Sequence, residues 1–391
     1  MKISEKFNWQ VLCPEDGHYF FGYYDRDPWN ADLSKHLTLK APQCEKLPQI
    51  GETAEVGYLE GTNGQFVPCA ETRAWCHQQG AMTLWLKHRQ NCFIYNDFDL
   101  KEQKFVARIY EIGRGVVGRY EWPVYAMSPD GRWGATLNFA RIPRRGYSYA
   151  DALLPDNKVP DLDQDGVFLI DMHTGTSTLL VNYRQLIAAH PMAYDLKDQY
   201  LWLNHIIFNC DSSKLLFLFR HCPEQRKPHW QTNMYTVDIN GSDLACTLSQ
   251  LHWTNGMISH QIWGRTPNEI LIDANWRQQG NEYVVFDDRI RPFRATRISR
   301  GMGPMAHLIF SPDGKWLLAD SYPKDGFQSL ARVNAENGEI EIIGRFRHQQ
   351  PDTFPVDVRC DLHPRWSADG KRITVDSIHQ GKRKVYLLNI E

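Results

Sequence analysis

The sequence has few features that would place the chain in a membrane, in an oxidising compartment or on nucleic acid. Its first residues, MKISEKFNWQ, hold no apolar run, so we expect no signal peptide. No apolar stretch approaches the length that a membrane span needs. The nine cysteines are an odd number without a CxxC pair, which predicts reduced thiols in a cytoplasmic protein. A net charge of −2 gives no electrostatic reason to expect nucleic acid or an anionic membrane as a partner.

Several common catalytic signatures are missing as well. The chain has no GxSxG nucleophile elbow, no HExxH zinc motif and no P-loop. Sustained helical periodicity is also scarce, and the best helix candidate, Asn182–His190, is short. Strands alternating with long helices are therefore not expected, which disfavours a parallel sheet.

A β-hairpin stands out in what is present. The segment Pro304–Asp320, PMAHLIFSPDGKWLLAD, reads as a strand, a Ser-Pro-Asp-Gly turn and a second strand. Proline presets one backbone dihedral of the turn, and Asp-Gly supplies the tight reversal. The pattern therefore predicts two antiparallel strands joined by the turn at Ser311–Gly314.

The hairpin recurs along the chain, at spacings in the range expected for propeller blades with loop insertions. A further strand pair with a polar, glycine-containing turn follows most copies, which gives four strands per unit. Seven units of this kind predict an all-β, seven-bladed β-propeller that forms a single domain over residues 1–391. The six other units are Gly22–Ala41, Gln79–Asp97, Val124–Asn138, Asn204–Leu218, Ser259–Asp273 and Leu362–Asp376.

Two further features refine this prediction. The last strand, Val385–Glu391, needs a partner from the other end of the chain, and Asn8–Cys13 is suited to close the ring. A loop insertion around residues 141–165 is long for a blade connection. Long loops on propellers often build the binding site, so we expect this one near the functional end of the channel.

One position of the repeat is occupied by histidine in four successive units. His307 lies thirteen residues before Asp320, for example, and the other three histidines keep the same phase. The first strand of each blade lines the central channel, so these side chains should share one space. Imidazoles placed there can hold a divalent metal or supply a general base, or they can be structural hydrogen-bonding groups between blades. The four residues are His205, His260, His307 and His363.

Other polar and aromatic side chains fall near predicted strand ends or loops. Arginines there could clamp a carboxylate, and aromatic rings could stack on a sugar. For each of them a solvated loop or a capped turn is an equally ordinary explanation. The candidates are Tyr24, Asp25, Trp75, Gln79, Tyr125, Arg141, Arg145 and Arg220.

Aspartates also recur near the channel, which leaves a hydrolase open. A glycosidase uses a pair of carboxylates. The same residues can instead be structural groups that cap turns, and we favour that interpretation. They are Asp25, Asp273, Asp320 and Asp376.

The hairpin motif, the terminal LHPRWSADGKRITVDSIHQGKRKVYLLNI and the unit count resemble the oligogalacturonate lyase family of seven-bladed propellers. The resemblance is best over residues 200–391. It implies a channel-mouth metal, usually manganese, held by three histidines and a glutamine, with a separate histidine as base and an assisting arginine. His307 and His363 match two metal positions, and Asp361 stands where the family has its third histidine. The glutamine position falls near Val358.

The same resemblance makes His260 the best match to the base, with His205 as the alternative. The assisting arginine falls near Asn233, and Arg220 could replace it. Tyr125 could act as the acid. The resemblance thus implies β-elimination on an acidic, uronate-containing oligosaccharide, with manganese as the expected metal and calcium or zinc as alternatives. A non-catalytic propeller that binds a saccharide or a protein is the second hypothesis, and the oligomeric state stays open.

Overall fold

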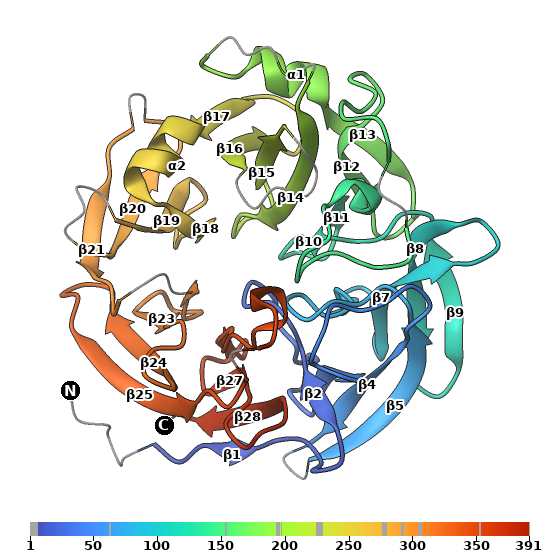
Figure 1. Cartoon of the computed structure of the whole chain (residues 1–391), viewed down its shortest axis with the longest axis vertical. Helices are drawn as coiled ribbons and strands as arrows, with labels where there is room; N and C mark the ends of the chain where they lie inside the picture. The colour runs from blue at the N-terminus through green and yellow to red at the C-terminus, as the bar shows by residue number, and fades with distance from the viewer. Residues whose placement is uncertain are drawn as a thin grey trace.

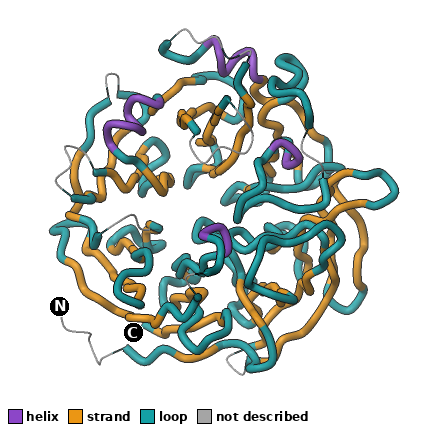
Figure 2. The backbone as a smooth tube through the Cα atoms, viewed as in Figure 1, coloured by secondary structure: helices purple, strands orange, loops and turns teal. Residues whose placement is uncertain are grey.

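The computed structural model describes residues 7–61, 64–152, 155–192, 196, 198–223, 230–275, 280–290, 293–303, 307–351 and 353–390. Within that part of the chain, the strands form seven four-stranded sheets arranged around a central channel (Figure 1). The tube view shows that strands dominate and helices are few (Figure 2). The predicted all-β, seven-bladed propeller is therefore confirmed.

The first three blades follow the chain from its N-terminal side. Blade 1 consists of β2 (His18–Phe20), β3 (Lys35–Ala41), β4 (Ala54–Glu60) and β5 (Gln65–Thr72). Blade 2 consists of β6 (Leu84–Trp85), β7 (Cys92–Asp99), β8 (Lys104–Glu111) and β9 (Gly115–Tyr120). Blade 3 consists of β10 (Ala126–Met127), β11 (Trp133–Thr136), β12 (Gly166–Asp171) and β13 (Ser177–Asn182).

The next three blades repeat this order. Blade 4 consists of β14 (Tyr200–Phe208), β15 (Lys214–Cys222), β16 (Gln231–Asp238) and β17 (Ala245–Leu248). Blade 5 consists of β18 (Ser259–Trp263), β19 (Glu269–Ala274), β20 (Glu282–Asp287) and β21 (Thr296–Arg300). Blade 6 consists of β22 (Leu308–Phe310), β23 (Trp316–Asp320), β24 (Phe327–Asn334) and β25 (Ile340–Arg347).

Blade 7 closes the ring with strands from both ends of the chain. It combines β26 (Arg365–Trp366), β27 (Arg372–Ser377), β28 (Lys384–Asn389) and β1 (Gln10–Val11). β1 pairs antiparallel with β28, with Gln10 opposite Leu387 and Val11 opposite Tyr386. The predicted closure by Asn8–Cys13 is confirmed, and β1 supplies the fourth, outermost strand of this blade.

Short helices decorate the ring. The predicted helix appears as α1 (Tyr183–Ala188), and a capping box in which Asn182 and Gln185 satisfy each other's backbone groups explains where it starts. It lies at the rim of the ring (Figure 1). A second helix, α2 (Gln250–Gly256), was not predicted. The 3-10 turns η1 (Phe139–Arg141) and η3 (Val356–Val358) lie in connections. None of the described helices is long and apolar enough to cross a membrane.

Buried carboxylates and amides in second strands tie one blade to the next. Asp376 accepts hydrogen bonds from the backbone N–H groups of Phe21 and Gly22, at 3.3 and 3.1 Å. Asp320 accepts one from the backbone of His363 at 3.1 Å. Such bonds satisfy backbone donors at the channel wall that no neighbouring strand can reach. We predicted that these aspartates cap turns. Asp376 and Asp320 do have the structural role that we favoured. They join neighbouring blades, however, and do not cap turns.

Candidate active site in the central channel

The four repeat histidines converge in the channel. The ring centroids of His260 and His307 lie 4.3 Å apart, and those of His307 and His363 are also separated by 4.3 Å. Tyr23 links the ring of His205 to the other three. Its own ring stacks on that of His205, with centroids 5.4 Å apart, and lies 5.0 Å from the ring of His363. The exposed fraction of each histidine is 8% or less. The common repeat position therefore does place these imidazoles in one shared space.

An unusual backbone turns three of these imidazoles into the channel. His205, His260 and His363 have φ angles of 53°, 50° and 43°, in the left-handed region that side chains rarely adopt. The pairing of β14 with β15 shifts register between Asn204 and Ile207 in blade 4. The pairing of β18 with β19 shifts at the corresponding place in blade 5. Bulges of this kind re-aim a side chain, and strained residues cluster at functional sites.

Tyr23 and Tyr24 fill the space beside the histidines. Their rings pack 4.6 Å apart, and Tyr24 lies 5.1 Å from His307. The preceding Gly22 allows the chain to enter the channel here. Its φ is 127°, and an added Cβ would meet the backbone carbon of Gln79 at 2.6 Å. Only glycine fits this crossing.

His307, Asp361 and His363 form a set of metal-ligating side chains. One ligand atom from each lies within 4.8 Å of the others, and all three residues are buried. The Nδ1 atom of His307 lies 3.0 Å from a carboxylate oxygen of Asp320, which leaves Nε2 free for a cation. Nε2 of His363 is buried without a hydrogen-bond partner among the described residues. Two imidazoles and a carboxylate suit a divalent transition metal, so the residues present fit such an ion.

Asp361 has a second partner in Arg359. The guanidinium donates two hydrogen bonds to the carboxylate, at 2.6 and 2.9 Å. Burial opposes ionisation of Asp361, but the charge and hydrogen bonds of Arg359 outweigh it and hold the pKa below its usual value. The carboxylate is therefore charged and available as an oxygen ligand.

His260 carries two polar neighbours. Its Nε2 lies 3.3 Å from the hydroxyl of Tyr322, and its Nδ1 lies 3.8 Å from a carboxylate oxygen of Asp273. Burial lowers its pKa, and the adjacent His307 adds to this effect. The imidazole is therefore neutral at physiological pH and able to accept a proton.

The guanidinium of Arg220 lies beside His205, and no described acidic residue pairs with it. Arg220, 9% exposed, donates from Nε to the hydroxyl of Thr232 at 3.2 Å and from Nη1 to the hydroxyl of Tyr147 at 3.4 Å. No carboxylate in the described part of the chain pairs with it. Burial lowers the pKa of His205 far below its usual value, and Arg220 makes the next largest contribution. A buried cation that no acid neutralises points to an anionic ligand.

The insertion around residues 141–165 reaches the same end of the channel. The ring of Tyr147 lies 5.8 Å from that of His205. Arg145 lies 3.5 Å from a carboxylate oxygen of Asp357 in η3, so the insertion also contacts the connection between blades 6 and 7. The guanidinium groups of Arg145 and Arg220 both lie over the ring of Trp230, at 4.7 and 5.2 Å from its centroid. Two arginines therefore stand together at this mouth.

Arg141 and Trp75 lie away from the histidine cluster. Arg141 is buried and donates to the backbone carbonyls of Leu201 and Lys158, so it anchors the insertion. Trp75 is completely buried, and its indole N–H donates to the carbonyl of Glu52 at 2.9 Å. Neither side chain presents a free surface to a ligand, so we do not include them in the site.

Gln79, Tyr125 and Asp25 lie in the wall below the cluster. Gln79 and the hydroxyl of Tyr125 are hydrogen-bonded at 3.0 Å, and that hydroxyl also accepts from the backbone N–H of His205. Tyr125 therefore supports the bulge that aims His205. Asp25 is buried 3.5 Å from Arg26, and burial raises its pKa. Tyr125 contacts the cluster through the backbone of His205, whereas Asp25 lines a cavity formed by the turns between first and second strands.

A cavity of about 900 Å³ opens at the other end of the channel. It is lined by the turns between first and second strands, including Lys87–Asn91 and Ser128–Pro129. None of the four histidines contributes to its wall. The volume suits a small ligand, but the chemistry described above lies at the opposite end.

The sequence did not point to Tyr322, Arg359 or Trp230, and Tyr147 stood out only as part of the long insertion. All four lie on connections between strands, where the repeat has no periodicity to align. One signal was available: Arg359 stands two residues before Asp361, the position that departs from the family pattern.

Comparison with known proteins finds similarity at the level of structure. No family model and no curated protein match the sequence. An oligogalacturonate lyase in complex with manganese superposes with a TM-score of 0.65 and 17% identity, covering 99% of this chain and 94% of that one. The oligogalacturonate lyase of Vibrio parahaemolyticus gives a TM-score of 0.64 and 15% identity, with coverages of 99% and 95%. At these identities the similarity shows a shared fold, which confirms the expected structural resemblance.

Proposed function

We propose that this protein is a lyase that cleaves a uronate-containing oligosaccharide by β-elimination. The observation that carries the proposal is the histidine cluster in which the imidazoles of His205 and His260 are neutral, next to Arg220, a buried guanidinium without a described acidic partner. Elimination from a uronate needs both groups. A base must remove the hydrogen next to the carboxylate, and a cation must neutralise that carboxylate so that the hydrogen becomes acidic.

His260 is the proposed base. Its lowered pKa keeps the imidazole neutral, and Asp273 and Tyr322 flank its two ring nitrogens. Arg220 is the proposed carboxylate partner, and Arg145 adds positive charge at the same mouth. The hydrogen on C5 passes to the imidazole, the double bond forms between C4 and C5, and the sugar on O4 leaves. The walls around the cluster exclude water from the developing charge.

His307, Asp361 and His363 would hold a divalent cation, with manganese as the first candidate. A cation bound there would supply additional positive charge for the carboxylate and for the negative charge that develops on it. Asp320 would orient His307 through Nδ1, and Arg359 would orient Asp361.

Ultraviolet absorbance tests the proposal directly. Elimination creates a conjugated double bond, so the purified protein should produce a rising absorbance with at least one oligosaccharide of a uronate panel. The panel should contain galacturonate, glucuronate and mannuronate oligomers, each with manganese and with a chelator. Sensitivity to the chelator would support the metal assignment. A folded protein that binds these sugars without any rise in absorbance would overturn the lyase and favour a binding propeller.

A further inference from the structure

Tyr322 has a position that none of the other tyrosines near the cluster shares. It lies in the connection that follows β23, and its side chain is partly exposed. Its hydroxyl is 3.3 Å from Nε2 of His260, the atom that would take the substrate hydrogen. Its ring centroid lies 5.9 Å from that of His260 and 6.0 Å from that of His307. Tyr322 therefore places a hydroxyl directly beside the proposed base.

Tyr125, which the sequence suggested as the acid, cannot take the same role. Its residue is 1% exposed, and its hydroxyl contacts the side chain of Gln79 and the backbone N–H of His205. A hydroxyl committed to three protein atoms has no direction left for a leaving group. The Tyr322 hydroxyl is hydrogen-bonded to the base itself and to the guanidinium of Arg359, and no described backbone group binds it.

Arg359 packs against the ring of Tyr322. Its guanidinium carbon lies 4.0 Å from the centroid of the Tyr322 ring, while its nitrogens bind Asp361. A cation over an aromatic face is attracted to the electron-rich ring. The attraction grows when the phenol loses its proton, so Arg359 favours the phenolate, whereas burial and the Asp361 carboxylate act more strongly and raise the pKa of Tyr322. Arg359 is thus a positioning residue that acts through Tyr322.

We propose that Tyr322 is the catalytic acid of the elimination and that it works on the same face of the sugar as His260. This inference rests on the proposed function. The imidazole takes the hydrogen of C5, the C–H electron pair forms the C4–C5 double bond, and the C4–O4 bond breaks. The hydroxyl of Tyr322 gives its proton to O4, so the leaving sugar departs neutral. The proton on Nε2 of His260 then returns to the phenolate across the 3.3 Å contact, which restores both groups.

The distance between acid and base selects the stereochemistry of the substrate. Groups 3.3 Å apart approach the pyranose ring from one side, whereas anti elimination needs them on opposite sides of the ring. In glucuronate and mannuronate, O4 and the hydrogen on C5 lie on the same face. In galacturonate they lie on opposite faces. The geometry therefore assigns a syn elimination and a substrate of the glucuronate or mannuronate class.

The first test compares substrates on the wild-type protein. Oligomannuronate and glucuronate-containing oligosaccharides should give the ultraviolet signal at a higher kcat/KM than oligogalacturonate. Turnover of galacturonate oligomers alone would overturn the syn assignment and leave the lyase intact. Absence of product from every uronate would overturn the lyase itself, and the inference with it.

The second test compares two matched variants. Tyr322→Phe keeps the ring under Arg359, so the melting temperature should not change, while kcat falls by about 100-fold or more. Tyr110→Phe removes a hydroxyl on the third strand of blade 2 and should leave kcat within a few-fold of the wild type. Equal activity of Tyr322→Phe and wild type would contradict the role of Tyr322.

A third measurement separates the acid from the base. In deuterated water, Tyr322→Phe should still exchange the C5 hydrogen of recovered substrate, since His260 remains, although product formation is slow. Arg359→Met should behave likewise, with partial recovery of product formation in Arg359→Lys, because lysine restores a cation near the ring. Loss of exchange together with elimination in Tyr322→Phe would show that Tyr322 acts on the base and not on the leaving group.

Discussion

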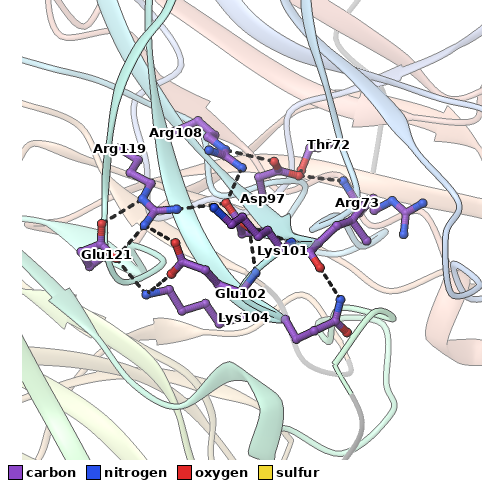
Figure 3. Close-up of polar contacts among 12 residues, drawn as sticks. Thr72, Arg73, Asp97, Lys101, Glu102, Lys104, Arg108, Arg119 and Glu121 are labelled. Carbon is purple, nitrogen blue, oxygen red and sulfur yellow. Dashed lines mark hydrogen bonds and ion pairs between the residues drawn. The ribbon is translucent and has the colours of Figure 1, made fainter.

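Two groups of charged side chains in this molecule follow opposite rules. On blade 2, Arg108, Arg119 and Lys104 each pair with two or more carboxylates of neighbouring strands (Figure 3). At the mouth of the channel, Arg220 is buried and no described acid pairs with it. The blade 2 charges balance one another in solvent, where ion pairs contribute little. The charge of Arg220 is not balanced by any described acid, in a buried place where that is costly.

The comparison shows where to look for function in a repeated fold. Both regions are rich in arginine, so composition does not distinguish them. What distinguishes them is the completeness of pairing, since a folded protein rarely buries a cation or an imidazole without a partner unless a ligand supplies one.

The largest effect is expected at the proposed base. His260→Ala should lower kcat by about 1000-fold, because general base catalysis contributes two to four orders of magnitude. Ultraviolet absorbance measures the loss, and the melting temperature checks the fold. The exposed His173 on blade 3 is the control, since His173→Ala should keep full activity. Retained turnover in His260→Ala would shift the base to His205.

Arg220 should give the next largest effect. Arg220→Gln should raise KM for the acidic oligosaccharide by about 10- to 100-fold, because charge-assisted hydrogen bonds to the carboxylate are lost. The same variant should not lose stability, since it removes a buried cation that no acid in the described part of the chain neutralises. Arg119→Gln on blade 2 is the matched control and should leave KM unchanged. An unchanged KM in Arg220→Gln would remove Arg220 from the substrate site.

Asp320 tests the metal set without removing a ligand. Asp320→Asn should weaken manganese binding by about tenfold or more, because the amide no longer fixes His307 with a negative charge at Nδ1. Isothermal titration calorimetry with manganese alone gives the affinity independently of activity. Asn334→Asp on the outer part of blade 6 serves as a control that leaves the donor set intact. An affinity equal to that of the wild type would argue against His307 as a ligand.

The smallest effect concerns stability in acid. Burial lowers the pKa of His77 to about 3, and the nearby Arg383 and His18 act in the same direction, against the hydrogen bond with Lys46. Below pH 6.5 the unfolded chain binds a proton that folded His77 does not. The free energy of unfolding should therefore fall by about 1.4 kcal/mol per pH unit from this residue alone until about pH 3.

Urea denaturation at pH 7 and pH 5 measures this slope. His77→Gln, which keeps a polar side chain without a titrating group, should make the slope shallower. The described ion pairs of blade 2 include no buried histidine that titrates in this pH range. Arg119→Gln should therefore leave the slope unchanged. A slope in His77→Gln equal to that of the wild type would assign the acid sensitivity to other buried histidines.

The sequence was sufficient for the fold because each hairpin is encoded locally. Turn residues fix the reversal, and alternating apolar residues fix the strands, so the pattern survives in every blade. The phase of His307 and His363 within the repeat was visible for the same reason. The closure by β1 could be predicted because an unpaired outer strand needs a partner.

The remaining part of the site lies outside the repeat. Tyr322 and Arg359 meet only after the blades have closed, and no local rule pairs residues 37 positions apart on two connections. The bulge at His205 likewise depends on Tyr125 from the neighbouring blade, which reaches the backbone through its hydroxyl. Trp75 illustrates the reverse error, since an aromatic residue near a strand end was expected at the surface and is buried.

The pairing of β1 with β28 also has a consequence for the order of events at the ribosome. Because Gln10 lies opposite Leu387, β1 can pair with β28 only after blades 1 to 6 have been synthesised. Blades 1 to 6 can assemble from strands that follow one another, as each ribbon leaves the exit tunnel. Blade 7 cannot. The histidine site needs His363 from blade 7, so it is completed only in the last step of folding.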